Sequence, residues 1–247
     1  MTEIPWRILG KRPGSVAVVS LFLAPDDTRR QRALEVFEAT FDFLELRVEA
    51  YREVPVRPEV LGPIAREAMP VMRQAIVRRP LACRTDASFD ARLYAAKQLT
   101  RSKLRRADAW HDLYFTSLST RTIVYKALSR AEGLESFYPD LSDPAFETRF
   151  CLFHRRFSIN TRTSWDKAQP LRVLAHNGEI NTVQGNRNWM RARQSQLVSE
   201  LLGDLRDVFP IVTPGASDSA SFDEVVELLS LGGRSLPHAI MMMIPEA

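Results

Sequence analysis

The first half of the chain alternates short apolar runs with amphipathic stretches. The run at residues 15–23 is apolar and β-branched and stops at Pro25, which predicts a buried strand. Over residues 26–46 apolar side chains recur every three or four positions and acids occupy the first turn, where the helix dipole favours them, so a helix is expected. Strands are expected again at 47–54 and 71–78. Together these segments predict a strand, helix, strand, strand unit of α+β type.

The second half also shows segments with the hydrophobic pattern of a helix and segments with the composition of a strand. A helix is expected over residues 88–107, and a connector rich in turn-forming residues over 135–144. The segments whose β-forming composition predicts strands are residues 112–119, 121–128, 149–158 and 171–176. The last two expected helices cover residues 189–202 and 222–229. The second should begin near Ser221, with Ser221 and Glu224 as its capping box.

The composition is that of a soluble globular protein. The 247 residues are 45% apolar and 26% charged, which suffices for a core without disulfides, and this length fits one or two domains. No apolar run approaches the ~20 residues of a membrane helix. The start of the chain shows no secretory leader. We therefore expect no membrane association and a cytoplasmic location.

The net charge of +4 does not indicate nucleic-acid binding. Arginine outnumbers lysine by 29 to 5, and acids are interspersed among the bases along most of the chain. The densest basic stretch, residues 101–106, lies in an expected helix without interleaved aromatic residues, whereas phosphate binding needs cations clustered on one face. Cys83 and Cys151 lack the spacing of a metal site. Neither nucleic acid nor a metal ion is expected to bind.

A few polar residues in the second half fit either a structural or a chemical role. Asn177-Gly178 follows an expected strand and is typical of a turn. A side-chain amide beside a glycine N–H can also donate two hydrogen bonds to one developing negative oxygen. Asp218 is explained equally well as part of a helix start. Arg155 and Arg156 are neighbours on an expected strand, so they face opposite ways and one of them needs a partner.

Four stretches taken together are far more specific than these single residues. They are SLSTRTIVYKAL at 117–128, FHRRFSINTRTSW at 153–165, LAHNGEINTVQGNRNWMRAR at 174–193 and SDSASFDEVVELLSLGGRSLPHAIMMMIPEA at 217–247. In this order they resemble the glutamine amidotransferase domain of the glutamate synthase large subunit, a class II amidotransferase of the N-terminal-nucleophile hydrolase superfamily. The resemblance runs from about residue 15 to residue 247 and is densest after Phe150.

The resemblance implies a fold and a reaction. The fold would be a four-layer αββα sandwich, here lacking its opening strands, and the reaction would hydrolyse glutamine to glutamate and ammonia for glutamate biosynthesis. Arg156 matches the residue that binds the α-carboxylate of L-glutamine, and Asp218 the residue that holds its α-ammonium. Asn177 and Gly178 match the oxyanion hole. These roles suit a zwitterion, which needs one fixed cation and one fixed anion, and the forked guanidinium matches a carboxylate.

The chain departs from the family at the nucleophile. The family starts with Cys-Gly, and that cysteine attacks glutamine with its own α-amine as the base. The 247 residues contain no such start. Cys83 and Cys151 are expected to be packed, reduced thiols, and Thr2 does not match the position of the nucleophile. We therefore expect residues 1–247 to be a partial class II amidotransferase domain cut at both ends and inactive alone, with residues 1–14 a leader of uncertain order.

Two alternatives remain open. The chain is a non-catalytic glutamine-binding or assembly module, or it is one half of a split enzyme whose other chain supplies the cysteine. The resemblance implies FMN and an iron–sulfur cluster in regions of the parent enzyme that this chain does not contain, so no cofactor is expected here. The expected partners are L-glutamine and the missing N-terminal segment or the synthase domain.

Overall fold

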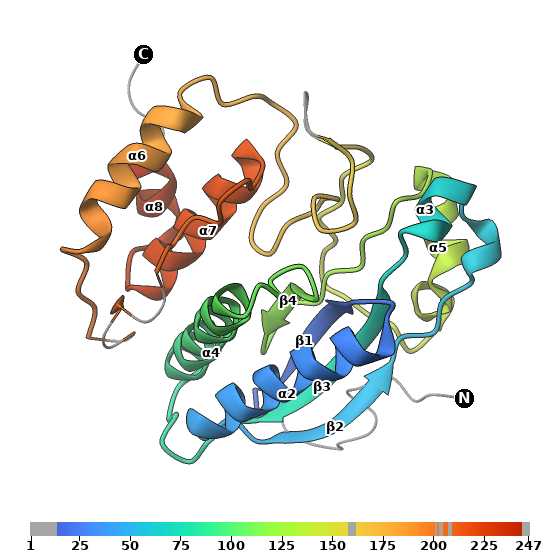
Figure 1. The fold of residues 1–247 in the computed structure, drawn as a ribbon, viewed down its shortest axis with the longest axis horizontal. Helices are drawn as coiled ribbons and strands as arrows, with labels where there is room; N and C mark the ends of the chain where they lie inside the picture. The colour runs from blue at the N-terminus through green and yellow to red at the C-terminus, as the bar shows by residue number, and fades with distance from the viewer. Residues whose placement is uncertain (1–13, 158–161, 201, 203–204, 207–208, 244–247) are drawn as a thin grey trace.

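The fold is α+β, as the sequence predicts. The computed structural model describes residues 14–157, 162–200, 202, 205–206 and 209–243 (Figure 1). The strands are β1 (Val16–Leu23), β2 (Val48–Glu53), β3 (Val71–Arg78) and β4 (Leu113–Ser119). The α-helices are α2 (Asp27–Phe43), α3 (Pro63–Glu67), α4 (Asp86–Arg106), α5 (Leu134–Phe137), α6 (Val183–Gln194), α7 (Asp218–Leu231) and α8 (Leu236–Met243). Short 3-10 helices are η1 (Pro58–Val60), η2 (Ala131–Gly133) and η3 (Pro139–Ser142). Of the leader expected at 1–14, residues 1–13 lie outside the described part.

The four strands form one antiparallel sheet in the order β2-β3-β1-β4. Helix α2 connects β1 to β2, and α4 connects β3 to β4, which is the ferredoxin-like βαββαβ arrangement. Val19 of the central strand β1 lies opposite Ala75 on one side and Leu118 on the other. Because a slip of one residue would turn the apolar side chains of β1 to the other face, burial holds this register. The expected strands at 15–23, 47–54, 71–78 and 112–119 are confirmed.

One face of the sheet packs against α2 and α4. Asp26 caps α2 by accepting a hydrogen bond from the backbone N–H of Arg29 at 2.8 Å. Phe37 and Phe41 of this helix are fully buried in the same apolar cluster as the strand residue Val19. Helix α4 also buries side chains on its other flank, where they meet α7. In Figure 1, α4 accordingly lies between the sheet and the C-terminal helices.

The opposite face of the sheet is covered by residues 120–142, a connector held by buried polar contacts. Arg52 of β2 donates two hydrogen bonds to the carboxylate of Asp140, at 2.8 and 2.6 Å, and Tyr125 donates a third at 2.7 Å. The expected strand at 121–128 is wrong, because side chains such as Tyr125, and not a strand ladder, hold this segment. The expected connector at 135–144 is confirmed, and its turns are α5 and η3.

Three further expectations differ from the structure. Residues 149–157 form no strand, and no backbone–backbone hydrogen bond reaches them from the described residues; Ser158 lies outside that part. A β-forming sequence makes a strand only where a neighbour satisfies its backbone. Residues 171–176 are also not a strand, because side chains of α7 bind their backbone. Helix α6 replaces the helix expected at 189–202, and it contains no buried residue from which a hydrophobic pattern could locate it.

A buried cluster of three acids and three bases joins α7 to α4. The acids are Asp223, Glu224 and Glu227 of α7, and the bases are Lys97 and Arg101 of α4 with Arg172 from the segment before α6. Arg172 is the centre of this set, which we call the Arg172 cluster. Its guanidinium lies 3.0 Å from the carboxylate of Asp223 and 3.2 Å from that of Glu227.

The Arg172 cluster satisfies its charges internally. Lys97 pairs with Glu227, and Arg101 lies 2.9 Å from Glu224. Lys97 and Arg101 are four residues apart on α4, so they share one face of that helix. An unpaired charge here would carry a large desolvation cost, since the side chain of Arg172 is only 9% exposed. Pairing therefore permits α7 and α4 to meet in this one arrangement.

The described helices include none that is both long enough and apolar enough to cross a membrane.

We expect Arg172→Met to destabilise the chain by about 3 to 5 kcal/mol, because it leaves buried carboxylates without a cation. Urea unfolding followed by circular dichroism measures this change. Arg155→Met is the matched control, since it removes an exposed pair with Glu132 at 3.2 Å and should cost no more than about 1 kcal/mol. Equal losses in the two variants would contradict the role given to the Arg172 cluster.

Stability should rise with pH between about 7 and 9, owing to buried Lys126. Burial, followed by the charge of Arg172, lowers the pKa of Lys126 to about 7. In the unfolded chain this amine keeps a pKa of about 10.4, so in that interval the unfolded state binds more protons. Lys97, whose pKa burial and Arg172 lower to about 8, acts in the same direction.

Urea unfolding at pH 7, 7.5, 8 and 9 tests this expectation. Lys126→Met should reduce the slope of unfolding free energy against pH by up to about 1.4 kcal/mol per pH unit. The mutation also removes hydrogen bonds to Tyr114 and to the carbonyl of Asp166, so only the slope is diagnostic. An identical slope in the wild type and the variant would rule out Lys126 as the titrating group.

Candidate functional site

Residues 169–180 form a loop that lies along the N-terminal half of α7; we call it the 169–180 loop. Asp223 fixes its middle, because one carboxylate oxygen accepts the backbone N–H of Val173 at 2.8 Å and that of Leu174 at 3.2 Å. Asp223 is fully buried and belongs to the Arg172 cluster. The position of the loop is therefore coupled to the packing of α7 on α4.

Asp218 fixes the end of this loop. It is the first residue of α7, and one carboxylate oxygen accepts the backbone N–H of Ile180 at 2.9 Å. The other oxygen accepts the N–H of Ser219 at 2.6 Å. Asp218 is half-buried, and its negative charge lies at the positive end of the helix dipole.

The start of α7 differs from the expected one. The N-cap is Ser217, whose hydroxyl accepts the N–H of Ala220 at 3.1 Å. The predicted capping box of Ser221 and Glu224 is wrong, since both residues lie inside the helix. Glu224 turns toward the Arg172 cluster instead. Asp218 thus has a structural role in the first turn as well as a carboxylate directed at the loop.

The predicted oxyanion residues lie between these two anchored points. Asn177 is exposed, and within the described residues its side chain makes no hydrogen bond. Gly178 packs on the ring of His176, so closely that a Cβ at this position would lie 3.0 Å from Nε2. Asp218 binds the backbone N–H of Ile180, which follows Gly178 by two residues. The segment that carries Asn177 and Gly178 is therefore tied to Asp218 by this hydrogen bond.

His176, Ser219 and Asp218 contain the three residue types of a hydrolytic triad. Nδ1 of His176 lies 2.9 Å from the hydroxyl of Ser219, which lies 3.3 Å from the carboxylate of Asp218. Here the serine stands between the other two, whereas a catalytic triad has histidine in the middle. Ser219 is also only 1% exposed, so it cannot reach a substrate. This set orients the loop and is not a nucleophile.

Arg156 is exposed and lies in a stretch without regular secondary structure. Its guanidinium forms no ion pair in the described part of the chain, and its backbone N–H donates to Nδ1 of His154 at 3.3 Å. Arg155 is the partnered neighbour, at 3.2 Å from Glu132. No described hydrogen bond or ion pair links Arg156 to Asp218, Asn177 or Gly178.

The two cysteines lie in different surroundings. Cys83 is 4% exposed in the core between the sheet and its helices, as predicted. Cys151 is exposed, which corrects the expectation that it is packed; the segment that carries it has no neighbouring strand to bury it. Thr2 lies outside the described residues. In those residues no group of His, Cys, Asp or Glu side chains is arranged to hold a metal ion.

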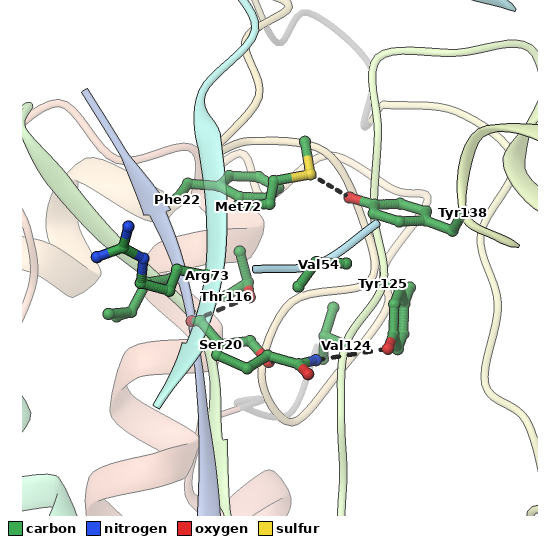
Figure 2. A pocket seen from close by; sticks show the side chains of 11 residues that line it. Ser20, Phe22, Val54, Met72, Arg73, Thr116, Val124, Tyr125 and Tyr138 are labelled. Carbon is green, nitrogen blue, oxygen red and sulfur yellow. Dashed lines mark hydrogen bonds between the residues drawn. The ribbon is translucent and has the colours of Figure 1, made fainter. Parts of the chain in front are cut away.

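Among the cavities of the described residues, two lie near the sheet that are not lined by any of the four predicted site residues. Figure 2 shows the smaller one, between the sheet and the connector, where Thr116 bonds to Ser20 and Tyr138 to Met72. Its volume of about 20 Å³ suits a single water and excludes an amino acid. The larger one, about 570 Å³, lies between the sheet, α4 and the loop that precedes α7.

Three residues that hold the site were not selected from the sequence: Gln169, Ser219 and Asp223. Ser219 and Asp223 belong to the stretch at 217–247 that carries the resemblance, so the motif itself was a signal. Their roles could not be inferred, because hydrophobic periodicity says nothing about which backbone N–H a buried carboxylate will meet.

Comparison with known proteins agrees with the motifs. The sequence model of the family "Glutamine amidotransferases class-II" matches residues 6–247. Ferredoxin-dependent glutamate synthase 2 of Arabidopsis thaliana is 39% identical over 258 residues, which cover 100% of this chain and 16% of that protein. The large chain of the NADPH glutamate synthase of Bacillus subtilis is 38% identical, over 92% of this chain and 15% of its own length.

The NADH glutamate synthase of Schizosaccharomyces pombe is 37% identical over 100% of this chain and 12% of its own length. This chain thus spans between an eighth and a sixth of the relatives it matches. The family match covers nearly all 247 residues, including the loop and the helix described above. The chain belongs to the class II glutamine amidotransferases.

Proposed function

We propose that this chain forms the substrate-binding and oxyanion part of an amidotransferase that hydrolyses glutamine to glutamate and ammonia within a glutamate synthase. The observation that carries this proposal is the link between Asp218 and the 169–180 loop, which joins the two predicted halves of a glutamine site. One half is a carboxylate for the substrate's α-ammonium, and the other is the Asn177-Gly178 pair for the oxyanion.

The chemistry follows from the residue types. A cysteine thiolate attacks the side-chain amide carbon of glutamine, and the carbonyl oxygen becomes an oxyanion. The amide of Asn177 and the N–H of Gly178 donate hydrogen bonds to that oxygen, which stabilises the tetrahedral intermediate. The amide nitrogen takes up the proton that the α-amine removed from the thiol and leaves as ammonia. Water then hydrolyses the resulting thioester to glutamate and free thiol. Arg156 binds the α-carboxylate, and its guanidinium is available because no described acid pairs with it.

The nucleophile must come from a Cys-Gly segment that these 247 residues do not contain. We further propose that this segment pairs with the β-forming stretches that the structure leaves without a ladder, such as residues 149–157, and so completes the four-layer αββα sandwich. In support, the backbone of residues 149–157 has no backbone partner in the described residues. Arg156 lies in this stretch, so the same pairing would fix its position.

Two other functions remain as outcomes of the experiments. A non-catalytic glutamine-binding or assembly module would bind glutamine through Arg156 and Asp218 without turnover. A split enzyme would gain activity when a second chain supplies the cysteine. FMN and the iron–sulfur cluster implied for the parent enzyme would lie in parts other than these 247 residues.

The purified 247-residue chain should release ammonia from glutamine no faster than buffer, because it lacks a cysteine with a free α-amine. Joining it to the Cys-Gly segment of a relative should restore glutaminase activity, measured by coupled ammonia detection. The same fusion with serine in place of that cysteine is the control. Ammonia release by the chain alone that is lost in Cys83→Ser, Cys151→Ser or Thr2→Ala would overturn the assignment of the nucleophile.

In the active fusion, variants at the site should separate binding from turnover. Asn177→Ala should lower kcat by about 10² to 10³ with little change in KM, since an oxyanion donor acts chiefly in the transition state. Asp218→Asn and Arg156→Lys should chiefly raise KM, the first by removing the counter-charge of the α-ammonium and the second by losing the fork. Steady-state kinetics with glutamine measures both parameters.

If Asp218 has only a structural role, Asp218→Asn should give a different result, and the same samples test this. As a residue of the first turn, Asp218 contributes to helix stability, so a purely structural role predicts a loss of roughly 0.5 to 2 kcal/mol with unaltered KM. Urea unfolding of each variant supplies the comparison. Destabilisation without any change in KM would remove Asp218 from the binding site.

A further inference from the structure

The side-chain amide of Gln169 makes two hydrogen bonds to the main chain of His176. Nε2 donates to the carbonyl oxygen of His176 at 2.6 Å, and Oε1 accepts the N–H of His176 at 2.7 Å. Two such bonds to one residue are what a neighbouring antiparallel strand forms with its hydrogen-bonded partner. The glutamine thus takes the place of a strand at a point where the described residues provide none.

These two bonds fix the Gln169 amide and the main chain of His176 in one relative orientation. The donor of Gln169 meets an acceptor and its acceptor meets a donor, so a flipped amide would place like groups against each other. Gln169 is 8% exposed, and little water is available to replace either bond. Losing the amide would therefore remove two hydrogen bonds from the main chain of His176.

His176 passes this constraint on to the predicted oxyanion donors. Its carbonyl belongs to the peptide bond between His176 and Asn177. Its ring packs against Gly178, where an added Cβ would lie 3.0 Å from Nε2 of the ring. The ring is held in turn by Ser219, at 2.9 Å. At the other end, Asp218 holds Ile180. The residues between are thus restrained on both sides, while the side chain of Asn177 stays exposed.

We infer that Gln169 is a positioning residue for glutamine hydrolysis: it sets the direction of the donors at Asn177 and Gly178 by holding the main chain of His176. This inference rests on the proposed function. Gln169 does not touch the reacting atoms. Its loss should lower kcat and leave KM almost unchanged. Misdirected donors lose their interaction with the oxyanion, while the groups that bind the α-amino acid end of glutamine stay in place.

Amide hydrogen exchange on the 247-residue chain tests the positioning itself, without any need for activity. Gln169→Leu keeps the approximate size of the side chain and removes both bonds. The exchange rate of the His176 N–H should rise roughly three- to tenfold, the equivalent of one lost hydrogen bond. The matched control is Gln74→Leu, a 1% exposed glutamine that bonds to Arg52, Ser20 and Tyr125 and makes no hydrogen bond to the 169–180 loop.

Kinetics of the active fusion tests the consequence for catalysis. Gln169→Leu should lower kcat about 10- to 100-fold with KM for glutamine within about twofold of the wild type. Gln169→Glu should behave in the same way, because it keeps the shape but sets an oxygen against the carbonyl of His176. Gln74→Leu should leave kcat unchanged at a comparable loss of stability, measured by urea unfolding.

The two experiments separate failure of this inference from failure of the proposed function. If the wild-type fusion is inactive, the proposed function fails, and the exchange rate still decides whether Gln169 holds His176. Unchanged exchange in a folded Gln169→Leu variant overturns the positioning role. Faster exchange with unchanged kcat overturns its link to catalysis, and so does an equal fall of kcat in Gln74→Leu.

Discussion

The arrangement of this chain depends on one buried arginine. Arg172 lies among the acids of α7 and holds two of them at about 3 Å, while Lys97 and Arg101 of α4 balance the remaining charge. A buried ion cluster of this kind does not by itself make a protein more stable, because desolvation offsets the attraction. It does make other packings costly, since any shift of α7 along α4 would strand a charge away from water. The cluster therefore acts chiefly on specificity of packing.

The site inherits its geometry from this packing. Asp223 pairs with Arg172 through one oxygen and holds the backbone of the 169–180 loop through the other, so the loop follows the helix. Asp218 and Gln169 then restrain the stretch around Asn177 from its two ends. A loop without regular secondary structure can hold donors still only when its N–H and C=O groups have fixed partners, and here buried side chains provide them.

The sheet and the site differ in how complete they are. The sheet pairs its four strands and buries a continuous apolar core against α2 and α4 within residues 16–119. The stretch that carries Arg156 has β-forming side chains but no strand beside it in the described residues. The relatives that this chain matches are far longer than the chain. The described residues link Asp218 to the loop of Asn177 and Gly178 by a hydrogen bond and show no such link to Arg156.

The sequence alone determined the elements that are defined by their own periodicity. Four strands and two long helices follow directly from the apolar pattern, because burial of one face repeats every second residue in a strand and about every 3.6 residues in a helix. The motif stretches likewise predicted Arg156, Asp218, Asn177 and Gly178 as site residues. Tertiary structure alone decided that residues 121–128 and 171–176 are not strands, that α7 begins at Asp218, and that Gln169 meets His176. These outcomes depend on which distant group satisfies each backbone N–H and carbonyl, and no local pattern of side chains contains that information.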